Sequence, residues 1–90
     1  MKDISIQVYV RGHVYLDAII KDDALTVISN VFGDYSSEKT YSFTKQQTER
    51  LFELIKFEDF IDTLRQRDIE WMEVFLRNNN IKPATHVWVS

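Results

Sequence analysis

The hydrophobic pattern of the chain changes its period near Thr44. Before this residue, apolar side chains from Ile4 to Val10 alternate with polar ones, which is typical of a strand with one buried face. After it, apolar side chains from Phe57 to Leu64 follow the spacing of one helix face. The pattern therefore predicts a chain that forms strands first and helices afterwards.

Four strands are predicted in the first half of the chain, over residues 3 to 10, 14 to 20, 25 to 32 and 39 to 43. Short turn-forming segments separate them, which favours an antiparallel meander. A fifth segment, residues 85 to 89, has strong strand propensity and is expected to return to the sheet as an edge strand. The pattern does not decide whether it pairs with the first or the fourth strand.

The register of the first hairpin follows from matching its apolar stripes, because residues directly opposite in an antiparallel pair share one face. This match pairs Val10 with Val14 across a three-residue or bulged turn at Gly12, where positive φ is accessible. It also places Tyr9 opposite Tyr15 on the other face.

The same reasoning sets the next two hairpins. The second is expected to pair Ile20 with Leu25, Ala18 with Val27, Val14 with Val31 and Asp17 with Ile28, and to place His13 opposite Phe32. The third is expected to pair Val31 with Tyr41 and Ser29 with Phe43.

The helical half begins with a capping-box sequence, in which Thr44 and Gln47 can each bond the backbone of the other. Two apolar faces that are out of phase predict a break near Lys56 and Phe57, and Asp68 can cap a further helix. Together these signals predict one α+β domain over residues 1–90. It has a four- or five-stranded, mainly antiparallel sheet (an N-terminal meander plus a C-terminal strand) with two or three helices packed on one face.

Composition narrows the functional classes. The net charge of −3 and pI of about 5.2 argue against binding to phosphate backbones, so nucleic acid is an unlikely partner. The chain has no cysteine, which excludes thiol chemistry and fits a reducing compartment. No signal peptide or membrane-spanning stretch is visible, and we expect a soluble cytoplasmic protein.

Catalytic and cofactor motifs are missing from the sequence. Two glycines are too few for a dinucleotide fingerprint or a phosphate-binding loop, and no close histidine pair is present for a metal. We therefore assign no catalytic, cofactor-binding or metal-binding residue, and no cofactor. The alternative hypothesis is a small enzyme or metal site around His13, Asp17 and His86, which would need the last strand to pair near the second.

The face of the sheet opposite the helices is expected to be rich in aromatic residues. A cluster at one end of it is our candidate partner-binding site: Tyr9, Arg11, His13, Tyr15 and Phe32. Tyrosine, phenylalanine and arginine are common anchors of protein interfaces, so the leading hypothesis is a non-enzymatic protein-interaction module that uses this face or an edge strand. Its partner would be another protein or a second copy of the chain. A second alternative is stacking of single-stranded nucleic acid on the same aromatic side chains. Residues 11–15 faintly resemble the aromatic strand of the RNA-recognition motif, but the order of strands and helices differs and most of that motif's residues are missing.

Three short segments also carry a family likeness. The segments are Tyr41-Ser42-Phe43-Thr44 followed by Gln47-Thr48-Glu49, then Glu58-Asp59-Phe60-Ile61, and Phe75-Leu76-Arg77-Asn78-Asn79-Asn80-Ile81. In these segments, which span the second half of the chain, the sequence resembles small uncharacterised proteins of Gram-positive bacteria. The resemblance implies no activity, because that group has no function that can be transferred.

Overall fold

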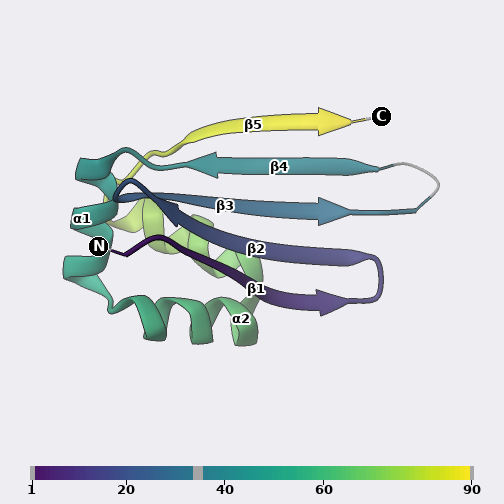
Figure 1. Cartoon of the computed structure of the whole chain (residues 1–90), viewed down its shortest axis with the longest axis horizontal. Helices are drawn as coiled ribbons and strands as arrows, with labels where there is room; N and C mark the ends of the chain where they lie inside the picture. Colours follow the sequence, from purple (N-terminus) through teal and green to yellow (C-terminus); the bar gives the residue numbers. More distant parts are fainter. Residues whose placement is uncertain (1, 34–35, 90) are drawn as a thin grey trace.

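The computed structural model describes residues 2–33 and 36–89, and it has an α+β fold (Figure 1). Within these residues, five strands form one sheet and two helices pack against it, as the sequence predicted. In chain order the elements are β1 (Ile4–Arg11), β2 (Val14–Lys21), β3 (Ala24–Val31), β4 (Ser37–Ser42), α1 (Lys45–Leu54), α2 (Phe57–Asn78) and β5 (Ala84–Val89).

The order of the strands in the sheet is their order in the chain, β1-β2-β3-β4-β5, and every neighbouring pair is antiparallel. The expected meander and the expected edge position of the last strand are both confirmed. The open question of its neighbour is also answered, because β5 pairs with β4 from Ser37 opposite Val89 to Ser42 opposite Ala84.

The first hairpin corrects the predicted register. Near β1's start, Ile4 lies opposite Ile20 as expected, but Tyr9 lies opposite Leu16, and Arg11 opposite Val14. The sequence placed one extra residue in a three-residue turn. In the structure a β-bulge at Val8 accommodates this residue, and the turn has only two residues, with φ of +59° at Gly12. The predicted pairing of Val10 with Val14 is wrong because the irregularity lies inside the strand instead of in the turn.

The second hairpin has the predicted register, with Ile20 opposite Leu25 and Val14 opposite Val31. The third does not, because Val27, not Val31, lies opposite Tyr41. The shift brings the polar residues Ser37 and Glu38 into β4, whereas the sequence predicted that this strand begins at residue 39. Polar residues fit here because the helices do not cover this part of the sheet, so neither face requires apolar side chains.

The two helices begin and end close to where the sequence signals place them. Thr44 caps α1 with the complete capping box, and the break falls between Leu54 and Phe57. The predicted restart at Asp68 is a kink within α2, where this residue has φ of 74° and its carboxylate accepts a hydrogen bond from the Ile69 N–H at 2.8 Å.

The core lies between the helices and one end of the sheet. Its fully buried side chains come from both layers: Leu16, Ile20, Leu25, Val27, Leu51, Phe60, Leu64 and Met72, with the polar Thr48 among them. Trp71 widens this core, with its ring centroid 5.9 Å from Phe60 and 5.3 Å from Phe75. None of the helices among the described residues is long and apolar enough to cross a membrane.

The helices cover only the end of the sheet that carries the β2–β3 turn (Figure 1). The strands continue past them toward the β1–β2 turn, the end of β3 and the start of β4, where both faces of the sheet are free of helices. We call this part the uncovered end. It consists of residues 12–15, 30–32, 37–39 and 87–89.

Candidate functional site at the uncovered end of the sheet

Tyr9 does not lie on the face where the sequence placed it. The bulge at Val8 turns Tyr9 toward the helices, since its opposite residue, Leu16, is buried in the core. Tyr9 is therefore separated from Tyr15 by the thickness of the sheet. Val10 takes its place on the outer face, opposite Tyr15.

Tyr9 and Arg11 instead form part of the contact between β1 and α2. The Tyr9 hydroxyl donates to the Asp68 carboxylate, and the Arg11 guanidinium lies 4.3 Å from the centre of the Tyr9 ring while donating to the Arg65 carbonyl. Burial and the bond to Asp68 raise the pKa of Tyr9 to about 12. The same hydrogen bond lowers the pKa of Asp68. These contacts give both residues a structural role.

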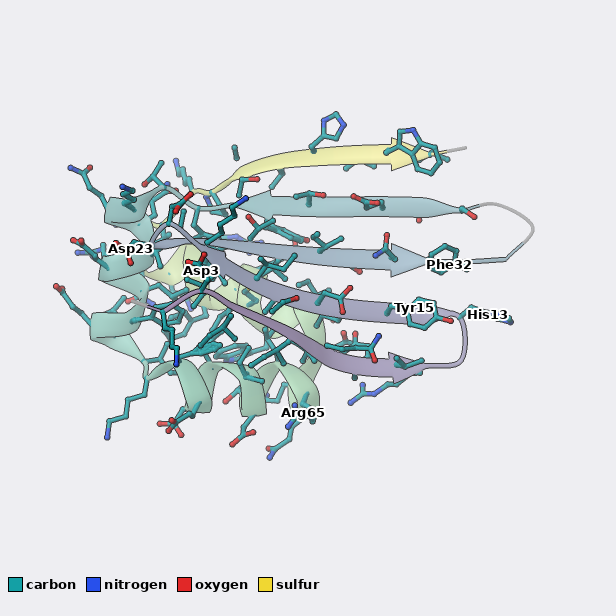
Figure 2. All side chains as sticks on the ribbon, in the orientation of Figure 1. Asp3, His13, Tyr15, Asp23, Phe32 and Arg65 are labelled. Carbon is teal, nitrogen blue, oxygen red and sulfur yellow. The ribbon has the colours of Figure 1, made fainter. Side chains whose placement is uncertain are left out.

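The other three candidate residues do come together on the outer face, as Figure 2 shows. The Phe32 N–H donates to the His13 carbonyl at 2.8 Å, and the rings of Tyr15 and Phe32 meet edge to face with centroids 5.1 Å apart. Phe32 remains 46% exposed. The cluster is therefore an accessible aromatic surface at the uncovered end.

A second exposed apolar feature is β5, the strand that the sequence predicted at an edge of the sheet. All six residues of β5 are exposed, and Val87, Trp88 and Val89 have exposed fractions of 59%, 52% and 65%. Trp88 lies on the same outer face as Tyr15, in the row that runs through Asn30 and Glu38. The signal for β5 in the sequence was its strand propensity, which predicted an edge position but did not determine the neighbouring strand.

The two edges of the sheet differ in their accessibility. At the β1 edge, the bulge at Val8 interrupts the strand, and the Arg65 Nε donates to the Val8 carbonyl at 2.9 Å. Bulges and covering side chains are two ways in which proteins block an edge strand. The β5 edge has no bulge in its ladder with β4, and it contains no charged residue and no proline. It is thus open to pairing with another strand.

The alternative catalytic constellation is not assembled. Asp17 and His86 lie in one row, but Ile28 and Thr40 separate them, so their backbones are about 14 Å apart at the usual strand spacing. His13 lies four residues before Asp17, in the turn that leads into β2, and is about 13 Å away from it. No group of three or more metal-ligating side chains occurs among residues 2–33 and 36–89.

A shallow hollow of about 270 Å³ lies where α2 ends and β5 begins. Leu76, Ile81 and Pro83 form its apolar wall, and Arg77 and Lys82 lie at its rim. The Tyr41 hydroxyl donates to Glu73 in this hollow at 3.1 Å, and burial followed by the nearby carboxylate raises the pKa of Tyr41. The Glu73 carboxylate is therefore already hydrogen-bonded within this hollow.

The observed geometry therefore offers surfaces for contact: an aromatic cluster on the outer face and an open, uncharged edge strand. Comparison with family models, with curated proteins and with solved structures found no match to this chain, and the resemblance to proteins of Gram-positive bacteria stays a prediction.

Proposed function

We propose that this chain is a non-enzymatic protein-interaction module that binds an extended segment of a partner along the free edge of β5. The observation that carries the proposal is the exposure of the whole strand, Ala84–Val89, at an edge with no blocking device. An edge strand presents a row of backbone donors and acceptors, and a peptide that adds as a further strand satisfies them.

The side chains of β5 support the same mode of binding. Successive residues point to opposite faces, so Val87 and Val89 lie on the helix side while His86 and Trp88 lie on the outer side. An added strand would contact both pairs at once, and Trp88 is a residue type that often anchors interfaces. The aromatic pair of Tyr15 and Phe32 lies two to three strands further along the outer face and would extend contact with a larger partner.

A protein partner fits this surface better than a nucleic acid does. Backbone pairing requires a peptide, whereas binding to a phosphate backbone depends on basic side chains, and β5 has none. The net charge of −3 adds repulsion toward phosphates.

The test is a quantitative pull-down with charge placed on the edge. Changing Val87→Lys and Val89→Lys together puts two charges on residues that are exposed in the folded chain, so folding is preserved while strand addition is opposed. The matched control, Val74→Lys with Leu54→Lys, changes two similarly exposed apolar residues on the helices. A partner that the wild type and the control capture equally, and that the edge variant loses, supports the proposal.

A second variant separates the edge from the outer face. Tyr15→Ala with Phe32→Ala removes the aromatic cluster and leaves β5 intact. We expect this variant to weaken capture less than the edge variant does. If the edge variant recovers the same proteins in the same amounts as the helix control, binding along β5 is refuted.

A further inference from the structure

The β5 edge has a sequence that complements itself when a second copy of the chain is placed against it. A two-fold axis perpendicular to a sheet brings two identical edge strands together antiparallel. The outer faces of the two sheets then form one surface, and their helix-covered faces form the other. Residues that face each other across the axis must then belong to the same face. Within Ala84–Val89, a register centred on Val87 meets this condition and pairs five residues.

This register matches side chains of the same character. Val87 meets its own counterpart at the axis, and His86 meets Trp88 of the second copy on the outer face. Thr85 meets Val89 of the second copy on the helix side. Aromatic and β-branched pairs of this kind are the ones that stabilise antiparallel sheets, and no charged residue opposes another.

The competing register is centred on His86. It would place two imidazoles opposite each other and set Trp88 against the small Ala84, so it loses the contact between Trp88 and His86. The arrangement centred on Val87 is therefore the better match.

The blocked β1 edge explains why such pairing would stop at two chains. The bulge at Val8 and the hydrogen bond from Arg65 leave each chain with one open edge. In a two-fold dimer the single open edge of each chain is covered by the other chain, so no open edge remains. A chain with two open edges could instead add copies without limit.

We propose that two copies of this chain associate through β5, centred on Val87, to form one continuous ten-stranded sheet with all helices on the same face. The proposal rests on the proposed function and names a second copy as the partner. The contact is one strand long, about 20 Å, so the dimer is expected to be weak, with a dissociation constant in the micromolar range.

The first test uses the absence of cysteine from the sequence. Opposed residues in an antiparallel pair have Cα atoms about 4.5 to 5.5 Å apart, which suits a disulfide. Under mild oxidation, Val87→Cys should cross-link into a covalent dimer at least about tenfold faster than Val89→Cys or Val74→Cys, since only the first lies at the axis. Equal rates for all three variants would refute the register.

The second test uses opposite charges at the same position. Val87→Lys and Val87→Glu should each be monomeric in sedimentation equilibrium, because identical charges meet at the axis. A mixture of the two should associate again, because opposite charges then meet. If wild-type protein is monomeric at millimolar concentration and the mixture does not associate, self-pairing is refuted. In that case loss of a captured protein in the edge variant would still support the proposed function.

Discussion

Thr48 gives the sharpest test of how the helical layer is held to the sheet. This threonine is fully buried in α1, and its hydroxyl accepts a hydrogen bond from the Leu25 N–H at 3.0 Å while donating to the Thr44 carbonyl at 2.8 Å. Leu25 is also fully buried, so water cannot replace the lost partner. Thr48→Val keeps the shape of the side chain and leaves this N–H without an acceptor.

The expected cost follows from that single orphaned donor. A buried N–H without a partner costs about 1–3 kcal/mol, so we expect Thr48→Val to lower the free energy of unfolding by about 2 kcal/mol. For a domain of this size that corresponds to a fall of about 10 °C in the melting temperature. The Thr44 carbonyl adds little to the cost, because it also accepts the Thr48 N–H at 2.9 Å.

The matched control is Thr48→Ser, which keeps the hydroxyl and removes one buried methyl group, at about 1 kcal/mol. Urea unfolding followed by circular dichroism should therefore rank the wild type first, the serine variant second and the valine variant last. Amide exchange at Leu25 should accelerate in the valine variant more than in the serine variant. A valine variant as stable as the serine variant would refute the reasoning.

Three further predictions concern the first hairpin and its contact with α2. Gly12→Ala should lower the free energy of unfolding by about 1 kcal/mol because φ is +59° there, and Gly33→Ala, at a glycine without positive φ, should leave urea unfolding unchanged. Because the pKa of Tyr9 is raised to about 12, its contribution to the free energy of unfolding is complete below about pH 10 and is lost as the pH rises to about 12. Tyr9→Phe should remove the tyrosinate absorbance that titrates near pH 12, and an unchanged titration would contradict the assignment. The pKa of Asp68 is lowered, so its contribution is present above the ordinary carboxyl pKa and is lost as the pH falls below it. In Asp68→Asn the free energy of unfolding should fall less steeply than in the wild type as the pH is lowered through the acidic range. An equally steep fall would disprove this role of Asp68.

The sequence predicted the layers of the fold better than it predicted the details of strand pairing. The second hairpin was predictable because its apolar stripes match in one register only, as Ile20 opposite Leu25 illustrates. The first was not, because the bulge at Val8 depends on contacts with residues far away in the sequence. It allows Tyr9 to reach Asp68 and Arg11 to reach the Arg65 carbonyl, and no local pattern encodes those distances.

The candidate site was predictable to a similar extent. His13, Tyr15 and Phe32 lie together because the turn and the second hairpin bring them to one face, which the apolar alternation already implied. Tyr9 changed faces with the bulge, and Arg11 followed it toward α2. The edge position of β5 was expected, but its neighbour was left open because strand propensity does not determine a neighbour, and β4 could be chosen only from the assembled sheet.

The position of β5 in the chain also affects the order in which the sheet is completed. β1 to β4 are neighbours in sequence and in space, whereas α1 and α2 separate β4 from β5. At the usual rate of translation, several seconds pass between the synthesis of β4 and that of Ala84–Val89. During that interval the edge of β4 has no neighbour within its own chain, so a nascent chain is exposed to strand exchange with other chains until its last strand is made.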